Sequence, residues 1–458
     1  MTRTHTAIVL FTRDLRVHDN PTLSAAVADA ERVVPLFVLD DAITQSPYLA
    51  PNRATFLVDC LHDLDASLRQ RGCDGLQVSR GDTATEVAAV VAKTGADVVH
   101  VSGDWSAHAQ RRRASLEEAL PVELVVHDET LVAVPPGVVV PGGKDHFAVF
   151  TPFHRRWADR PRRPVLDAPR TLAPRSAVKP ALTSPGRIAA ADTLCAGDRA
   201  THLPPGGERE GRRRMHAWLR TSVTAYDDHH DDLAADDTSR LSPYLHFGCI
   251  SPVELIAKAG RSRGAEALVR QLSWRDFHLQ VLAARPEAGV RDYRGHGDRW
   301  RDDPDDLAAW AAGATGYPIV DAAMRQLRTE GWMHNRGRLV VGSFLTKTLY
   351  LDWREGARHF MHHLVDGDVA NNQLNWQWVA GTGTDSRPNR VLNPLRQAER
   401  FDPSGDYVRR HVPELATIEG PAVHTPWKLP AEVRAGLDYP EPIVDLDEGR
   451  QRFQEARR

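Results

Sequence analysis

Cysteine is scarce in this sequence, which limits the kinds of site that the chain can carry. The four cysteines lie far apart and form no C-x-x-C pair: Cys60, Cys73, Cys195 and Cys249. A zinc site or a disulfide framework needs closer spacing, so we expect neither a metal nor a disulfide. The same usage of cysteine leads us to expect a protein of the reducing cytoplasm.

Long apolar runs and a strong net charge are also missing. No segment reaches the roughly 20 apolar residues that span a bilayer, so we expect no membrane association. Charged residues follow the N-terminus too closely for a signal peptide. The net charge of -3 means that any nucleic-acid surface must be local, and the basic segment 321–347 is one candidate. No apolar stripe demands a dimer, so we expect a monomer.

Short apolar runs alternate with amphipathic stretches through residues 1–131. Four runs predict strands: 6–11, 33–39, 97–102 and 122–127. Three stretches predict helices: 21–32, 52–72 and 85–95. This alternation predicts a doubly wound α/β domain with a parallel sheet and a ligand crevice at the strand ends. No G-x-G-x-x-G follows the first strand, so the usual dinucleotide fingerprint is missing.

The rest of the chain changes character twice. Residues 132–205 are rich in proline and arginine and have weak periodicity, which predicts a long interdomain linker. Residues 206–458 show helical periodicity almost throughout, which predicts an all-α domain. The 458 residues are enough for the two or three domains that this division implies.

Tryptophan is concentrated in the predicted helical domain. Seven of the eleven tryptophans fall between Trp274 and Trp378. Indole stacks on planar rings and donates a hydrogen bond, so the concentration favours a flat aromatic cofactor or an unstacked base. A cluster of core aromatic residues explains the density equally well.

One helical face in this region combines several useful groups. Gln271, Trp274, Arg275 and His278 follow the spacing i, i+3, i+4 and i+7 and therefore share a face. Amide, indole and guanidinium groups can bind the edge and face of a base. Taken alone, an amphipathic helix with Trp274 packed inward is the simpler interpretation.

Further polar residues follow in three segments. Asn335 and Arg338 lie three residues apart, and Arg338 can pair with Asp366. Asp366 and Asp368 are weak candidates for a metal, because no further ligand stands at suitable spacing. The segment 238–243 offers hydroxyl and backbone N–H groups at a predicted helix start, which suits either a diphosphate or an ordinary N-cap.

Several long motifs, taken in order, resemble the DNA photolyase/cryptochrome family over essentially the whole chain. They include FTRDLRVHDN, TSRLSP, WRDFH, GYPIVDAAMRQL, GWMHNR, DWREG, DGDVANN and NWQW. The resemblance is closest to bacterial class I photolyases, which repair cyclobutane pyrimidine dimers (CPD). It implies light-driven repair of UV-damaged DNA by electron transfer from photoexcited, fully reduced anionic FAD to a flipped-out dimer.

The resemblance also implies a set of residues that bind FAD. Residues expected at the phosphates and ribityl chain are Tyr226, Thr238, Ser239, Arg240, Leu241 and Ser242. Residues expected around the flavin are Arg275, Asn335, Arg338, Asp366, Asp368 and Asn372. Asn372 matches the position that faces the central-ring nitrogen and supports the reduced state.

DNA contacts and an electron relay are implied in the same way. Trp274 and Trp378 are expected to stack on the dimer, and Arg336 to contact a backbone phosphate. Gln271, Arg275, His278 and Asn335 complete the expected DNA-binding set. Trp376, Trp353 and Trp300 fill the positions of the relay that photoreduces the flavin, with packing as the alternative for the last two.

Two positions bear on competing functions. Gln271 stands where class I enzymes usually have Glu, and an amide cannot hold or release a carboxyl proton. Asn335 is the CPD-type residue and argues against a (6-4) photolyase. A cryptochrome-type photoreceptor without repair is the main alternative, although the long tail usual for cryptochromes is not seen after residue 440.

The resemblance also suggests a second, light-harvesting chromophore. The lysine that folate-binding members use is not apparent near RPEAGV, and the segment LFVLDDAI with APNR resembles deazaflavin-binding members. We therefore expect 8-hydroxy-5-deazaflavin, with methenyltetrahydrofolate as the alternative. Arg53 and Asp104 are its expected contacts.

Overall fold

The computed structural model describes residues 4–173, 193–195 and 197–457 and divides into two compact units. The sheet unit comprises Met1–Asp198, Pro204–Thr224 and Ser239–Pro286. The helical unit comprises Arg199–Leu203, Ala225–Thr238 and Glu287–Arg458. Among the described residues, no helix is both long enough and apolar enough to cross a membrane.

A five-stranded parallel sheet forms the centre of the sheet unit. Its strands are β1 Thr4–Phe11, β2 Ala30–Asp40, β3 Gln77–Gly81, β4 Val98–Ser102 and β5 Glu123–His127. They lie in the order β3-β2-β1-β4-β5, so the strand order reverses beside β1. This confirms the predicted doubly wound arrangement, in which such a reversal opens a crevice at the carboxyl ends of the strands.

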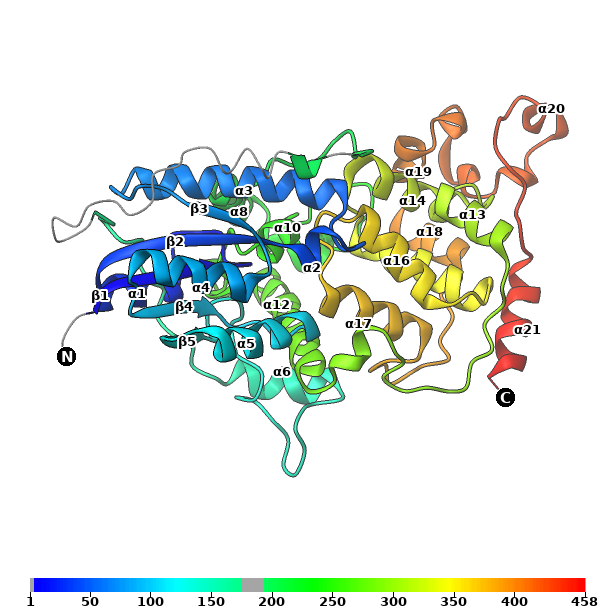
Figure 1. Cartoon of the computed structure of the whole chain (residues 1–458). Helices are drawn as coiled ribbons and strands as arrows, with labels where there is room; N and C mark the ends of the chain where they lie inside the picture. The colour runs from blue at the N-terminus through cyan, green and yellow to red at the C-terminus, as the bar shows by residue number, and fades with distance from the viewer. Residues whose placement is uncertain (1–3, 174–192, 196, 458) are drawn as a thin grey trace. The chain divides into compact units, whose positions relative to one another are not determined.

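The helices of the sheet unit are α1 Pro21–Asp29, α2 Asp41–Thr44, α3 Pro51–Arg69, α4 Thr83–Thr94, α5 Ala107–Ala119, α6 Phe150–Ala158, α8 Glu208–Thr221, α10 Ser242–His246, α11 Pro252–Ala259 and α12 Arg263–Ala284. The helices α1 to α5 alternate with the strands, as this topology requires, and the other helices of the sheet unit follow the last strand. Alternate strand residues such as Ile8, Leu36 and Val99 pack with Val87 of α4 and Leu116 of α5 in one apolar core. Figure 1 shows α3 and α8 running side by side in the same unit.

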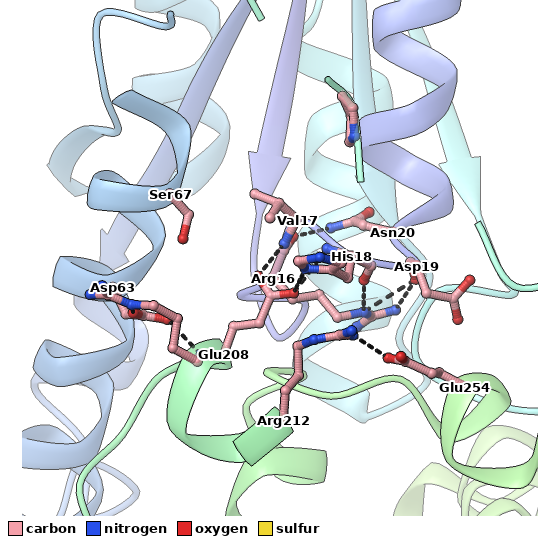
Figure 2. A network of polar contacts seen from close by, with 12 residues as sticks. Arg16, Val17, His18, Asp19, Asn20, Asp63, Ser67, Glu208, Arg212 and Glu254 are labelled. Carbon is pink, nitrogen blue, oxygen red and sulfur yellow. Dashed lines mark hydrogen bonds and ion pairs between the residues drawn. The ribbon is translucent and has the colours of Figure 1, made fainter. Parts of the chain in front are cut away.

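A buried polar network fixes the loop that follows β1, and Figure 2 shows it from close by. Glu208, at the start of α8, accepts hydrogen bonds from the backbone N–H groups of Val17 at 2.7 Å and His18 at 2.9 Å. Arg16 is 1% exposed and donates to the carbonyl oxygens of Thr130 at 2.7 Å and Gly248 at 3.0 Å. Segments far apart in the chain are thereby joined into one compact unit.

The helical unit is built almost entirely from helices, as predicted. They are α9 Tyr226–His229, α13 Pro304–Ala312, α14 Pro318–Glu330, α15 Asn335–Ser343, the π-helix η4 Phe344–Thr348, α16 Trp353–His363, α17 Val369–Ala380, α18 Pro394–Phe401, α19 Asp406–His411, α20 Ala431–Arg434 and α21 Leu446–Ala456. One large apolar core, which includes Trp310, Phe344, Trp353 and Trp376, holds them together.

Two parts of the sheet unit differ from the sequence expectation. The short strand β3 was not predicted, because it contains only one apolar residue, Val78. The predicted linker 132–205 contains α6, whose Phe150, Phe153 and Trp157 are buried; residues 174–192 and 196 of it lie outside the described residues. The predicted domain boundaries after residues 131 and 205 stay a prediction, since compact packing does not show which segments fold independently.

Candidate functional site

Polar side chains gather around a small cavity in the helical unit. The cavity has a volume of about 80 Å³ and is lined by α15, α16, α17 and the segment before α17. Its polar lining consists of Asn335, Arg338, Asp366, Asp368, Asn371, Asn372 and Asn375. Asn371 and Asn375 were not predicted, although their spacing of three and seven residues from Asp368 places them on one helical face.

An ion pair stands in this cavity. The guanidinium of Arg338 donates to Asp366 Oδ2 at 2.8 Å and to the carbonyl oxygen of Met333 at 2.9 Å. The second carboxylate oxygen of Asp366, Oδ1, is buried and has no hydrogen-bond partner among the described residues. A buried acceptor without a donor is costly, so this oxygen is suited to an N–H group of a bound ring. The pairing of Arg338 with Asp366 confirms the plainer of the two predicted uses of this aspartate.

The start of α17 orients the amides around the cavity. Asp368 caps the helix, because its carboxylate accepts from the backbone N–H of Asn371 at 2.9 Å and from its side-chain amide at 2.8 Å. Asn372 donates through Nδ2 to the carbonyl oxygen of Ala357 at 3.0 Å, which ties α17 to α16. In the described residues, no group of three His, Cys, Asp or Glu side chains could hold a metal ion.

The three predicted relay tryptophans share the apolar core of the helical unit. Trp376 lies 4.9 Å from the Phe360 ring and packs on α16 where Gly356 leaves room; a Cβ there would stand 2.2 Å from the indole. Trp353 is fully buried and donates through Nε1 to Asp292 at 2.8 Å. Trp300 is partly buried against this core, with its ring 4.9 Å from that of Tyr350. The electron-transfer role stays a prediction.

The two residues that open α15 have different surroundings. Asn335 is exposed at the first position of the helix. Arg336 donates to Asp231 Oδ2 at 2.5 Å and lies over the ring of Phe401, with its guanidinium carbon 4.2 Å from the centroid. A phosphate would therefore have to compete with Asp231 for this guanidinium. The predicted phosphate contact of Arg336 has no support from this geometry and stays a prediction.

Trp378 lies near the end of α17 and is partly buried. The guanidinium carbon of Arg390 is 5.1 Å from the centroid of its ring, within the range of a cation–π interaction. Arg390 is itself exposed, and nothing in its local sequence pattern marked it as a partner of Trp378.

The predicted phosphate-binding residues divide between the two units. In the helical unit, Tyr226 begins α9 and burial raises its pKa to about 12, while Thr238 has a buried Oγ1 without a partner among the described residues. In the sheet unit, Ser239 and Arg240 precede Leu241 and Ser242 at the start of α10. Arg240 adopts a left-handed backbone with φ of 49°, which marks a sharp turn. The hydroxyl of Thr238 is suited to a hydrogen bond with a bound group.

The four residues predicted to share a face of α12 differ in solvent exposure. Gln271 is exposed, Trp274 and Arg275 are partly buried, and His278 is only 1% exposed. Arg275 donates to the carbonyl oxygen of Leu131 at 2.6 Å. Gln271 and Trp274 are therefore accessible to a ligand, whereas His278 is not.

Trp274 is covered on one side by an aromatic residue that the sequence analysis missed. The ring of Phe150, from α6, lies parallel to the indole with a centroid separation of 3.6 Å and an interplanar angle of 6°. Arg270 covers the Phe150 ring, with its guanidinium carbon 4.9 Å from the centroid. Asp276 of α12 holds α6 in place, because its carboxylate accepts a hydrogen bond from Trp157 Nε1 at 2.9 Å. Burial raises the pKa of this carboxyl, against the opposing charge of Arg275.

A second cavity lies in the sheet unit after β4. Its volume is about 340 Å³, and its lining includes Asp104, Trp105, Gln110, Arg112 and Asp128. Arg53 is not part of this lining; it is bonded to the carbonyl oxygen of Tyr48 through Nε at 3.1 Å. The cavity thus contains one of the two expected chromophore contacts.

Comparison with known proteins gives matches along most of the chain. Residues 7–173 match the family model described as DNA photolyase, and residues 268–458 match the FAD binding domain of DNA photolyase. The chain is 58% identical over 461 residues to a deoxyribodipyrimidine photo-lyase of Streptomyces griseus, covering 98% of this chain and 99% of that protein.

Two further comparisons agree in length and fold. A deoxyribodipyrimidine photo-lyase of Escherichia coli K12 is 34% identical over 466 residues and 97% of each chain. The crystal structure of a bacterial class III photolyase from Agrobacterium tumefaciens superimposes with a TM-score of 0.88 at 31% identity, covering 100% of this chain and 98% of that chain.

Proposed function

The chain belongs to the DNA photolyase family, and from that premise we propose that it is a deoxyribodipyrimidine photo-lyase, a lyase that uses light to split cyclobutane pyrimidine dimers in UV-damaged DNA. The observation that carries the proposal is the cavity in the helical unit. It combines the Arg338–Asp366 pair, a ring of amides and the indole of Trp376. We place the chain nearest to the class I enzymes on its sequence motifs.

The cavity of about 80 Å³ takes only an edge of a flavin ring, and its polar groups match the hydrogen-bonding groups of that edge. A flavin ring offers N–H donors and carbonyl acceptors at its edge, and Asp366 Oδ1 is a buried acceptor without a donor. Arg338, Asn335 and Asn372 would orient the ring, while Thr238 and its neighbours would bind the phosphates. When bound in its fully reduced anionic form and excited by light, FAD supplies the electron that opens the cyclobutane ring, and the electron afterwards returns.

The dimer would reach this chemistry by leaving the duplex. DNA photolyases are a known example of enzymes that flip bases, and a dimer is already poorly stacked, which lowers the cost. Trp274 and Trp378 would stack on the flipped dimer, and the exposed amide of Gln271 would bind a pyrimidine edge. Arg275 and Asn335 would support the bound strand.

The aromatic core of the helical unit supports a second activity of the same protein. Trp376, Trp353 and Trp300 would carry an electron toward the cofactor from the surface, so that the flavin becomes reduced. Indole is suited to this task because it gives up an electron more easily than other side chains of the core.

The decisive experiment measures repair of UV-irradiated oligothymidine by protein with reduced FAD, under blue light and in darkness. Light-dependent recovery of thymine absorbance is the expected result. Binding of the oligonucleotide without repair, with the flavin demonstrably reduced, would instead favour a cryptochrome-type photoreceptor. Repair restricted to (6-4) products would contradict the role given to Asn335.

The identity of a light-harvesting chromophore is a separate proposal. The cavity of about 340 Å³ beside Asp104 suits a planar ring system, and we assign it to 8-hydroxy-5-deazaflavin rather than methenyltetrahydrofolate. Titration of the protein with each compound, followed by the excitation spectrum of flavin reduction, distinguishes the two. Action as a monomer, without a metal and in the cytoplasm, likewise stays a proposal.

A further inference from the structure

A buried lysine lies inside the helical unit, at a local change in helix type. The chain passes from α15 into the π-helix η4, Phe344–Thr348, before α16 begins. Such wide turns are rare and often stand at functional positions. Lys347 belongs to this π-helix and is 1% exposed.

The ammonium group of Lys347 is held by two carbonyl oxygens of one loop. Nζ donates to Pro388 O at 2.7 Å and to Arg390 O at 2.7 Å. The same loop is bound once more from this side, since the backbone N–H of Leu392 donates to Ser343 Oγ at 3.0 Å. The loop between α17 and α18 thus rests on the segment that joins α15 to α16.

This loop carries the arginine that covers Trp378. The carbonyl of Arg390 accepts from Lys347, and its guanidinium lies over the Trp378 indole at 5.1 Å. The loop also closes on the end of α17, where a Cβ at Gly381 would stand 2.3 Å from the carbonyl oxygen of Pro388. The position of Lys347 is therefore transmitted through a single residue to the indole.

We propose that Lys347 is a positioning residue for lesion binding: its buried ammonium clamps the loop 381–392 and so sets the surface that Trp378 and Arg390 present to damaged DNA. The inference rests on the proposed function, because it takes Trp378 as a residue that stacks on the dimer. Lys347 itself touches neither DNA nor cofactor in this account.

The surroundings of Lys347 make the clamp sensitive to pH. Burial lowers its pKa to about 7; Asp385 and Asp298 oppose this shift, whereas Arg457 and Arg390 add to it. Loss of the proton removes the charge that strengthens both hydrogen bonds, so the loop is held less firmly above neutral pH. An unfolded lysine keeps its proton up to about pH 10.4, so this same group makes global stability rise with pH between about 7 and 10.

The test compares wild type with Lys347→Met, which keeps the length and removes the charge, and with Lys93→Met, an exposed lysine of α4, as the matched control. Dissociation constants for a dimer-containing oligonucleotide are measured in darkness at pH 6 and pH 9. We expect Lys347→Met to bind about threefold more weakly at pH 6 and wild type to approach it at pH 9. FAD absorbance and repair per photon at saturating DNA remain unchanged.

A second measurement needs neither DNA nor cofactor. Trypsin cleavage after Arg390, normalised to cleavage of a free peptide at each pH, reports how firmly the loop is held. Faster cleavage in Lys347→Met at pH 7, with wild type converging on it at pH 9, supports the clamp. The cleavage measurement can test the clamp even if wild type shows no repair. Absence of repair would contradict the proposed photolyase function and not the clamp.

Two results would overturn the proposal. One is equal dimer affinity of Lys347→Met and wild type at pH 6, with both proteins folded and loaded with FAD. The other is loop cleavage that does not differ between them at any pH. If Lys347→Met fails to fold, Lys347→Gln, which keeps a hydrogen-bond donor without the charge, takes its place, and loop cleavage equal to that of wild type at pH 7 rejects the clamp.

Discussion

Trp274 of the sheet unit and Trp378 of the helical unit are proposed to do the same work, yet they are held by different physical means. Trp274 is fixed by an aromatic neighbour, because Phe150 stacks parallel to it at 3.6 Å. Trp378 is covered by a cation, Arg390, whose loop depends on the buried charge of Lys347. The ring in direct contact with Trp274 is apolar, whereas the group in direct contact with Trp378 is a cation.

This difference predicts how pH and salt affect the support of each indole. Stacked apolar rings do not titrate and are little affected by salt. The ammonium of Lys347, whose pKa burial lowers to about 7, loses its charge as the pH rises above neutrality. We therefore expect alkaline pH to weaken the contribution of Trp378 to dimer binding while leaving that of Trp274 intact.

The largest effect is expected from removing the aromatic support. Phe150→Ala deletes a side chain that is 5% exposed and stacks on Trp274, so it should cost about 3 kcal/mol of folding free energy. Dimer affinity should fall about tenfold, because the plane of the indole is no longer fixed. The loss should be the same at pH 6 and pH 9, as measured by thermal unfolding and by binding in darkness.

Phe150→Tyr keeps the ring and serves as the control, with affinity near that of wild type. The comparison fails if the affinity lost in Phe150→Ala depends on pH as strongly as wild-type binding does. It also fails if Phe150→Leu, which preserves bulk without a ring face, behaves like Phe150→Tyr, since packing alone would then suffice.

An intermediate effect is expected from the two arginines that cover aromatic rings. Arg390→Ala removes the cation from the Trp378 face and should weaken dimer binding by about two- to fivefold. Arg270→Ala removes the cation from the Phe150 ring, one residue further from the indole, and should cost less than twofold. Equal losses for the two variants, measured at one ionic strength, would mean that each arginine acts simply as a positive charge near DNA.

The smallest effect is expected from placing a carboxyl group beside Trp274. Gln271→Glu places a carboxyl one helical turn before Trp274. Repair per photon at saturating DNA should then acquire an acidic limb near pH 4–5, where a glutamate gains its proton. The change above pH 6 should stay within about twofold. A profile identical to that of wild type would show that position 271 does not contact the dimer.

The sequence predicted the fold where local patterns decide it. Apolar runs such as 33–39 identify buried parallel strands, and the capping residues and periodicity of the segment before Gly95 identify α4. It could not reveal β3, because QVSRG owes its place to pairing with β2 rather than to its own composition. It also did not reveal α6, whose apolar residues stand among prolines and arginines.

The candidate site was predictable in its residue types but not in its partners. Asn335, Arg338, Asp366 and Asn372 do line one cavity, and Arg338 does pair with Asp366. The contact of Phe150 with Trp274 joins residues more than a hundred positions apart, and no local period carries that information. The sequence predicts a phosphate contact for Arg336. It does not indicate the ion pair with Asp231, because the two residues lie far apart in the sequence.

The carboxylate of Glu208 determines when the loop after β1 can complete its folding during synthesis. It completes the loop at Val17, which leaves the ribosome 191 residues earlier. At about 5–20 residues per second, that interval lasts roughly 10–40 s. During it the central strand β1 has been synthesised, but the loop that follows it lacks its acceptor. A chaperone that binds nascent chains would meet this segment first, before any part of the helical core exists.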